Sequence, residues 1–153
     1  MDQRRVGRYE RIYAQLEDLI GKSPDLVAAM ATVCAVLHHK MQHHFWTGFY
    51  FVETDNRLRV GPYQGPVACQ ELDPPEGVCW ASASSLQPVI VADVHSFPGH
   101  VACDGRSRSE ITLPVFDTEG VLKAVFDVDS DREASFTETD SVNLEKILKL
   151  VYK

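Results

Sequence analysis

The hydrophobic pattern of this chain changes its period twice along the sequence. Over residues 4–20 apolar side chains recur at every third or fourth position, which predicts one apolar stripe along a helix. The same spacing returns over residues 137–152, where Thr137 is expected to cap a last helix. The stripe residues are Val6, Tyr9, Ile12, Tyr13, Leu16, Leu19 and Ile20 in the first helix, and Leu144, Ile147, Leu148 and Val151 in the last.

Between these helices, short runs rich in aromatic and β-branched residues are separated by turn residues, which is typical of strands. Turns of four residues inside two pairs of runs predict hairpins. Helices at both ends and hairpin-linked strands between them predict the α+β class, with an antiparallel sheet covered by helices on one face. The runs are residues 45–52 and 58–60 around a turn at 53–56, residues 89–92, and residues 110–116 and 121–128 around a turn at 117–120.

A second apolar helix is expected directly after the first. Gly21 ends the first helix, and residues 23–25, Ser-Pro-Asp, predict an N-cap, a proline at the first helical position and an acidic first turn. The helix would run to about Met41, and its apolar composition indicates packing against the sheet. Cys34 lies within it and is expected to be a small buried hydrophobic residue rather than a reactive thiol.

Four histidines at the end of this second helix resemble a metal cluster at first sight. A favourable contact with the carboxyl end of the helix dipole, together with solvent exposure, explains them about as well, so no metal is assigned to them. These residues are His38, His39, His43 and His44.

Two long segments are predicted to be irregular. Residues 61–77 are rich in glycine and proline, and residues 93–110 carry reactive and turn-forming residues between two strand-like runs. Loops of such length are usually functional or disordered, and Phe97 and Val101 give the second one apolar anchors. We therefore interpret residues 93–110 as an active-site or binding loop centred on Cys103.

A short helix is expected between them, over residues 78–86, with Cys79 near its amino terminus. A helix amino terminus lowers a thiol pKa and raises the thiolate fraction. The helices occupy one face of the sheet, so both irregular segments are expected on the other. There they can bring Cys69, Cys79 and Cys103 together over a pocket.

Alternation along two strands places further side chains on single faces. Trp46 and Tyr50 are four positions apart and share a face of their strand, where core packing and a pocket lining are both compatible with them. Asp127 and Asp129 likewise share a face. Two neighbouring carboxylates need solvent, a metal or a cationic ligand group to compensate them, unless the strand simply frays into the charged turn that follows.

Composition narrows the function classes. The formal net charge of −7 argues against nucleic acid and anionic membrane as partners. The one concentration of basic residues, Arg4, Arg5, Arg8 and Arg11, is interpreted as a solvated helix face. No apolar stretch approaches the roughly 20 residues of a membrane span, and no signal-peptide core begins the chain, so a cytosolic location is expected.

In a reducing compartment the four cysteines do not predict a structural disulfide framework. The chain has no CxxC pair, and the last three cysteines are spaced by 10 and 24 residues, unlike the close ligand pairs of structural zinc sites. No metal and no cofactor are therefore expected. A zinc or iron site built from Cys69, Cys79, Cys103 and His100 is the minor alternative.

Several motifs together carry a specific resemblance to a known family. They are residues 46–50 (WTGFY), 61–69 (GPYQGPVAC), 77–79 (GVC), 93–104, 107–111 (SRSEI) and 127–130 (DVDS). In this order and spacing, over about residues 40–140, the chain resembles the free methionine-(R)-sulfoxide reductases, single-domain enzymes of the GAF superfamily. The resemblance implies a single GAF domain over residues 1–153, with a helical segment at 1–42 and the sheet, active-site loops and last helix at 45–153.

The resemblance also implies roles for the three cysteines. Cys103 matches the nucleophile, and Cys69 matches the recycling cysteine that closes a disulfide with it. Cys79 matches the third family cysteine, whose division of labour differs between members. One departure lies beside it: the family commonly has glycine at the position of Trp80, and a bulky ring there could change the short helix or a dimer contact.

By the same resemblance, Trp46 and Tyr50 line the site for the methyl sulfoxide. Glu110, Asp127 and Asp129 match the acidic residues that hold the substrate's amino group and assist protonation. Chemistry supports this set, because a thiolate that attacks a sulfoxide needs a carboxylic acid to protonate the departing oxygen, and clustering raises a carboxyl pKa.

The expected cycle leaves the nucleophilic cysteine as a sulfenic acid, which a second thiol condenses into a disulfide. A thioredoxin-type dithiol would then restore the thiols by exchange. Because the carboxylates suit the α-ammonium of a free amino acid, the expected substrate is free methionine-(R)-sulfoxide. The apolar N-terminal helices are compatible with a homodimer. A non-catalytic GAF sensor, with a small ligand and redox-responsive cysteines, is the main alternative.

Overall fold

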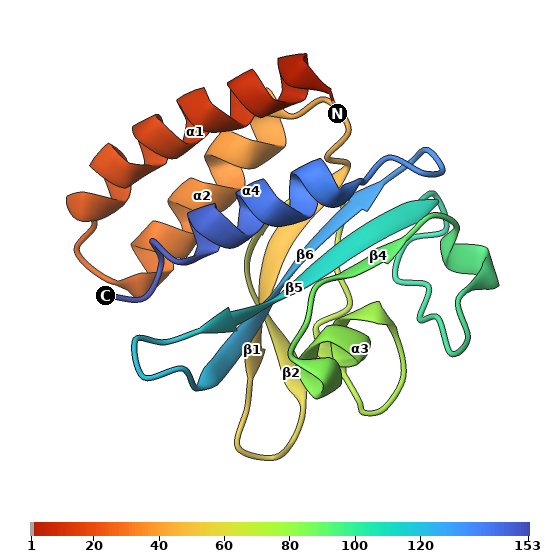
Figure 1. Cartoon of the computed structure of the whole chain (residues 1–153). Helices are drawn as coiled ribbons and strands as arrows, with labels where there is room; N and C mark the ends of the chain where they lie inside the picture. Colours follow the sequence, from red (N-terminus) through yellow and green to blue (C-terminus); the bar gives the residue numbers. More distant parts are fainter. Residues whose placement is uncertain (1) are drawn as a thin grey trace.

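Six strands form one antiparallel sheet in the order β3-β2-β1-β6-β5-β4 (Figure 1). The computed structural model describes residues 2–153. The expected α+β class and both hairpins are confirmed, and β1 and β6 lie at the centre of the sheet. The elements are α1 (Gln3–Gly21), α2 (Leu26–Lys40), β1 (Trp46–Val52), β2 (Leu58–Gln64), β3 (Glu71–Leu72), α3 (Val78–Ser85), β4 (Val89–Val91), η1 (Val94–Ser96), β5 (Ser109–Phe116), β6 (Leu122–Ser130) and α4 (Glu138–Leu148).

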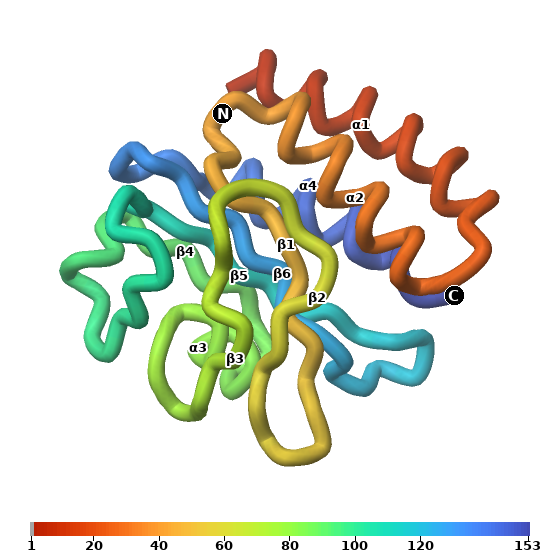
Figure 2. Tube along the Cα trace, turned by 180° about the vertical axis from the view of Figure 1, so that it is seen from behind, coloured from red at the N-terminus to blue at the C-terminus, as the bar shows by residue number. Residues whose placement is uncertain are grey.

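Three long helices cover one face of this sheet. In both views α1, α2 and α4 lie on the same side of the strands (Figures 1 and 2). Their apolar stripes pack against the sheet residues Phe49, Phe126 and Val128, all of them fully buried. Cys34 on α2 is buried in this layer, as expected. Packing of apolar helix faces on a half-apolar sheet therefore fixes which face is left for a site.

The opposite face carries a smaller cluster built around α3. Trp46, Tyr50 and Trp80 are buried here with Leu58, Leu72 and Val125. The Trp80 ring fills space beside β3, and its Nε1 donates to the carbonyl oxygen of Leu72 at 2.9 Å. Figure 2 shows α3 on the far side of the strands from the long helices.

Gly48 is required by the packing of Trp46 on this face. A Cβ added at Gly48 would lie 2.5 Å from the Trp46 ring and 2.4 Å from the Tyr63 Cβ, closer than carbon atoms approach one another. Trp46 therefore lies flat across β1, stacked between Tyr50 at 5.8 Å and Tyr63 at 5.2 Å between ring centroids.

Several predicted boundaries were wrong. The second helix is capped by Asp25, whose carboxylate accepts from the Ala28 amide at 2.8 Å, and not by Ser23, whose hydroxyl instead donates to the Leu19 carbonyl. β2 continues through residues 61–64, which were expected to be irregular, because Tyr63 and Gln64 pair with β1 beyond a register shift. The last helix ends at Leu148 rather than near Tyr152.

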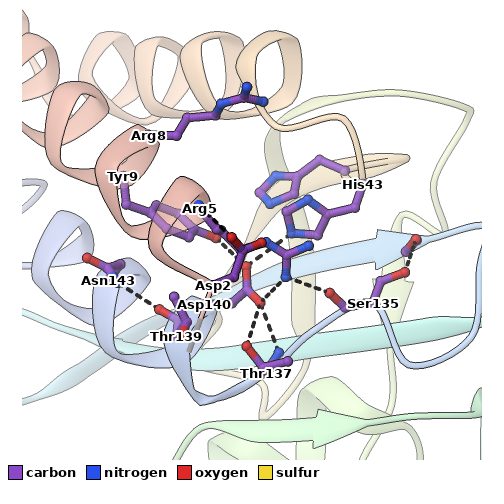
Figure 3. A network of polar contacts seen from close by, with 12 residues as sticks. Asp2, Arg5, Arg8, Tyr9, His43, Ser135, Thr137, Thr139, Asp140 and Asn143 are labelled. Carbon is purple, nitrogen blue, oxygen red and sulfur yellow. Dashed lines mark hydrogen bonds and ion pairs between the residues drawn. The ribbon is translucent and has the colours of Figure 1, made fainter.

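A buried carboxylate, Asp140, ties the helical layer together (Figure 3). It accepts hydrogen bonds from the Tyr9 hydroxyl at 2.6 Å, from His43 Nε2 at 3.0 Å and from the Thr137 amide at 2.9 Å, and Arg5 Nη1 forms an ion pair with it at 2.9 Å. Burial by itself would raise the pKa of Asp140, but the hydrogen bonds from His43, Tyr9 and Thr137 hold that pKa at about 2.

This cluster corrects two interpretations of the sequence. Arg5 is not part of a freely solvated face, because it reaches across to Asp140 and the Ser135 carbonyl. His44 is buried rather than exposed at the helix exit, and its Nδ1 contacts the Thr47 hydroxyl at 3.3 Å. These contacts explain part of the basic and histidine-rich pattern near the amino terminus by packing.

No helix within residues 2–153 combines the length and apolar character that crossing a membrane requires.

Candidate active site

The pairing of β5 with β6 brings three acidic side chains together. Glu110 is the direct partner of Asp129, and Thr112 is the partner of Asp127. Because side chains alternate along a strand, Glu110, Asp127 and Asp129 project from the face that the long helices leave open. The prediction that Asp127 and Asp129 share a face is confirmed. A frayed, charged strand end is excluded, because β6 stays paired through Ser130.

Two of these three carboxyl groups are buried, and none of the three has a cationic partner among residues 2–153. Glu110 and Asp127 are about 6% and 5% exposed, and Asp129 is half-buried. Burial raises the pKa of all three, and the charge of Asp127 raises those of Glu110 and Asp129 further. Within the described chain none of the ion pairs involves any of them. A cationic group is what such a cluster lacks.

Cys79 joins this cluster from the first turn of α3. The thiol is buried, and α3 is fixed to β5 because the Thr112 hydroxyl donates to the Val78 carbonyl at 3.2 Å. The predicted lowering of its pKa is wrong: burial raises the Cys79 pKa, and the nearby carboxyl groups of Asp127 and Glu110 raise it further. Desolvation and like charge outweigh a short helix dipole here.

Cys69 and Cys103 are joined by a disulfide, with 5.3 Å between their Cα atoms. Cys69 comes from the segment between β2 and β3, and Cys103 from the long loop before β5. Cys103 is exposed and Cys69 is half-buried. The two irregular segments therefore do converge on this face, although Ser109 and Glu110, counted with the loop in the sequence, belong to β5.

Two aromatic residues connect the sheet to the cysteine-bearing segment. Trp46 Nε1 donates to the Pro66 carbonyl at 3.0 Å, and the Tyr50 hydroxyl donates to the Cys69 carbonyl at 3.0 Å. Burial raises the Tyr50 pKa, so its hydroxyl stays protonated and remains a donor. The polar ends of both rings are thus satisfied by the segment that carries Cys69, while their faces are left for a cavity.

The predicted site residues other than Cys69 line one cavity. This cavity holds about 590 Å³ of empty space, including solvent at its open mouth. The alternatives of core packing and pocket lining for Trp46 and Tyr50 are therefore both realised. The predicted residues in the lining are Trp46, Tyr50, Cys79, Cys103, Glu110, Asp127, Asp129 and the His100 of the metal alternative.

Sequence reasoning missed several residues of the lining, among them Phe45 and Asp104. Arg106 Nη2 forms an ion pair with Asp104 at 2.8 Å, and the Arg106 guanidinium lies 5.0 Å from the centroid of the Phe45 ring. Hydrogen bonds from Arg106 hold the pKa of Asp104 at about 2. The Asp-x-Arg spacing next to Cys103 was visible in the sequence, but the neighbouring Phe45 is 61 positions away and only the fold brings it there.

The metal alternative predicted from Cys69, Cys79, Cys103 and His100 is not the arrangement found, because the disulfide occupies two of those sulfurs. The described residues contain one group of three potential metal ligands, namely Cys79, Glu110 and Asp127.

The chain is similar in sequence to several known proteins. The sequence profile described as GAF domain matches residues 23–151. The GAF domain-containing protein A of Dictyostelium discoideum is 42% identical over 94% of this chain and 90% of its own. The free methionine-R-sulfoxide reductase of Escherichia coli (strain K12) is 32% identical over 95% of this chain and 87% of its own.

A solved structure gives the same relationship in three dimensions. The free methionine-R-sulfoxide reductase from Neisseria meningitidis, determined in complex with its substrate, is similar with a TM-score of 0.89 and 38% identity, over 94% of this chain and 85% of that one.

Proposed function

Because this chain belongs to the GAF domain family and, within it, to the free methionine-R-sulfoxide reductases, we propose that it reduces free methionine-R-sulfoxide through Cys103. One observation carries the proposal: Cys103, which is joined to Cys69 by a disulfide, lines the same cavity as three carboxyl groups that have no cationic partner within residues 2–153. A free amino acid with an electrophilic sulfur presents the complementary groups. The enzyme is accordingly an oxidoreductase with an antioxidant role.

The carboxyl cluster supports binding of the substrate's α-ammonium group. Asp127 and Asp129 share a face and lack ion-pair partners within residues 2–153, so an ammonium would neutralise them and supply hydrogen bonds. The Oδ1 atom of Asp127 is buried without a hydrogen-bond partner, which is the vacancy such a donor would fill. A methionine inside a polypeptide has no α-ammonium, so the free amino acid is favoured.

Trp46 and Tyr50 would hold the other end of the substrate. Their stacked rings form an apolar wall of the cavity, suited to the methyl group and side-chain carbons. Glu110, whose pKa is raised by burial and by Asp127, would be the proton donor to the sulfoxide oxygen.

In the chemical step the Cys103 thiolate attacks the sulfoxide sulfur while the oxygen is protonated. The bond between the two sulfur atoms and the S–O bond of the substrate then break as the oxygen is transferred to Cys103, which becomes a sulfenic acid, and methionine leaves with its sulfur reduced by two electrons. Cys69 then condenses with that sulfenic acid and releases water. The disulfide between Cys69 and Cys103 supports this step. Cys79, buried beside Asp127, is assigned to the site without a reacting role.

Recycling needs an external dithiol, and we expect a thioredoxin-type protein. Cys103 is the more exposed sulfur of the pair, and Val67 and Val101 are exposed on the two segments that the disulfide joins. Thiolate attack on Cys103 would release Cys69, and the reductant's second thiol would then free Cys103. The single-domain organisation, a homodimer and a cytosolic location remain parts of the proposal.

The test is release of methionine from separated R and S epimers of free methionine sulfoxide, with dithiothreitol as reductant. Turnover is expected for the R epimer alone, and Cys103→Ser should abolish it. Cys34→Ser is the matched control, because Cys34 is a cysteine on the opposite face of the sheet. Absence of turnover with folded, fully reduced wild type would instead favour a ligand-binding sensor.

A further inference from the structure

The cavity brings Cys79, which has no reacting role in the reduction cycle, next to two of the carboxyl groups that the cycle uses. The Cys79 sulfur and one carboxylate oxygen each from Glu110 and Asp127 lie within 4.8 Å of one another. All three side chains are buried. They come from α3, β5 and β6. The Thr112 hydroxyl fixes α3 to β5 through the Val78 carbonyl at 3.2 Å and the Ser82 hydroxyl at 2.7 Å, and β5 is paired with β6. Three potential metal ligands, one thiol and two carboxyl groups, therefore lie close together on packed elements.

A separate observation shows that one of these three side chains is incompletely paired. Asp127 is about 5% exposed, yet its Oδ1 atom has no hydrogen-bond partner. Buried carboxylate oxygens are nearly always paired, since an unpaired one costs the desolvation of a charged group. Asp127 is also in the lining of the cavity, which opens to solvent.

We propose that Cys79, Glu110 and Asp127 bind one Zn²⁺ ion, which excludes the substrate from the cavity. A thiolate with two carboxylates suits zinc, which accepts sulfur and oxygen ligands together, whereas Mg²⁺ and Ca²⁺ take oxygen ligands. Three protein ligands leave the fourth tetrahedral position for water. On binding, zinc replaces the proton of the Cys79 thiol and the proton of the Glu110 carboxyl group, and both protons pass to solvent.

The consequence for activity rests on the proposed function. Asp127 would be shared between the zinc ion and the substrate's ammonium group, so the two cannot bind together. Zinc bound here would inhibit without touching Cys103. The site also survives oxidation, because the disulfide joins Cys69 and Cys103 and leaves Cys79 free.

The experiment titrates ZnCl₂ into metal-free, fully oxidised protein and follows the heat in two buffers of different ionisation enthalpy. Oxidised protein is used because it needs no dithiothreitol, which chelates zinc, and because Cys103 is then closed in the disulfide. We expect one ion per chain, with proton release visible as a difference between the buffers. Cys79→Ser should weaken binding by about tenfold or more.

Two further variants complete the design. Cys34→Ser removes the other free thiol and should bind zinc like wild type. Asp127→Asn should weaken binding without removing the thiol, and it serves if Cys79→Ser fails to fold. No binding to wild type would overturn the site, and so would unchanged affinity in Cys79→Ser or in Asp127→Asn, which would place the ion elsewhere, for example at the histidines.

The turnover assay in metal-free buffer separates this proposal from the proposed function. Turnover without zinc binding would overturn the zinc site alone. Zinc binding that depends on Cys79, in a protein that turns over neither epimer, would support the site and overturn the reductase proposal.

Discussion

Buried carboxyl groups lie on both sides of the sheet, and their electrostatic surroundings are opposite. Asp140, in the first turn of α4, is fully buried but is surrounded by Arg5, His43, Tyr9 and the Thr137 amide, and its pKa is held at about 2. Glu110, Asp127 and Asp129, on the other face, have no cation among the residues described, and their pKa values are raised.

This difference distinguishes a carboxylate that stabilises the fold from carboxyl groups that are available to bind a ligand. Folding itself supplies every partner of Asp140, so the negative charge strengthens the native state. The opposite cluster is left incomplete by folding and includes a buried oxygen without a partner. A protein tolerates such a cost where a ligand completes the arrangement. The comparison predicts that the two groups respond in opposite ways to neutralisation.

The largest effect is expected from Asp127→Asn. This variant removes the charge proposed to hold the substrate ammonium, so kcat/KM for free methionine-R-sulfoxide should fall about 1000-fold, equivalent to about 4 kcal/mol. The free energy of unfolding at pH 7 should stay unchanged or rise, because one repulsive charge is lost from an uncompensated cluster. Steady-state kinetics and urea unfolding measure the two quantities. A variant that was destabilised but fully active would break the comparison.

Asp140→Ala should show the reverse pattern. It leaves Arg5 and His43 without their buried partner and removes the capping contact of Thr137, so the free energy of unfolding should fall by about 3 kcal/mol. At a temperature where the variant remains folded, kcat/KM should match wild type, because Asp140 lies on the face away from the cavity. Urea unfolding checks the first statement. A large loss of kcat/KM in folded Asp140→Ala would contradict the second.

The smallest effect concerns pH. Asp140 has a lowered folded pKa, so its stabilisation is present above the unfolded value of about 3.9 and is lost as the pH falls towards about 2, by about 2 kcal/mol. Glu110 has a raised folded pKa, so stability is highest below its unfolded value of about 4.3 and declines as the pH rises through the interval up to the folded value.

Unfolding of the oxidised protein between pH 3 and pH 8 tests both signs. Asp140→Asn should flatten the acidic side of the stability curve, and Glu110→Gln should flatten the decline towards neutral pH. If Glu110→Gln altered only the acidic side, the carboxyl would be compensated like Asp140.

Sequence periodicity predicted the fold class, both hairpins and the faces of Trp46, Tyr50, Asp127 and Asp129. These features depend on which side of a helix or strand a side chain occupies, and that is local geometry. The boundaries that failed have a different cause. Strand β2 continues through Gly61 and Pro62 because β1 offers it a partner, and Asp25 rather than Ser23 caps α2 because its carboxylate is the one that reaches the Ala28 amide.

The electrostatic state of each group could not be obtained from the sequence. The expectation that a helix terminus lowers the Cys79 pKa considered one neighbour along the chain, whereas the thiol is buried beside two carboxyls from other strands. In the same way, Arg5 and His43 looked solvent-exposed until Asp140, about a hundred residues away, was placed beside them.

The fold class, the inward- and outward-facing side chains and, through the motifs, the family were therefore predictable from the sequence. Which carboxylate is compensated and which is left open became known only from the folded chain. The physical reason is that burial and charge interactions depend on distances through space, while hydrophobic periodicity depends on distance along the chain.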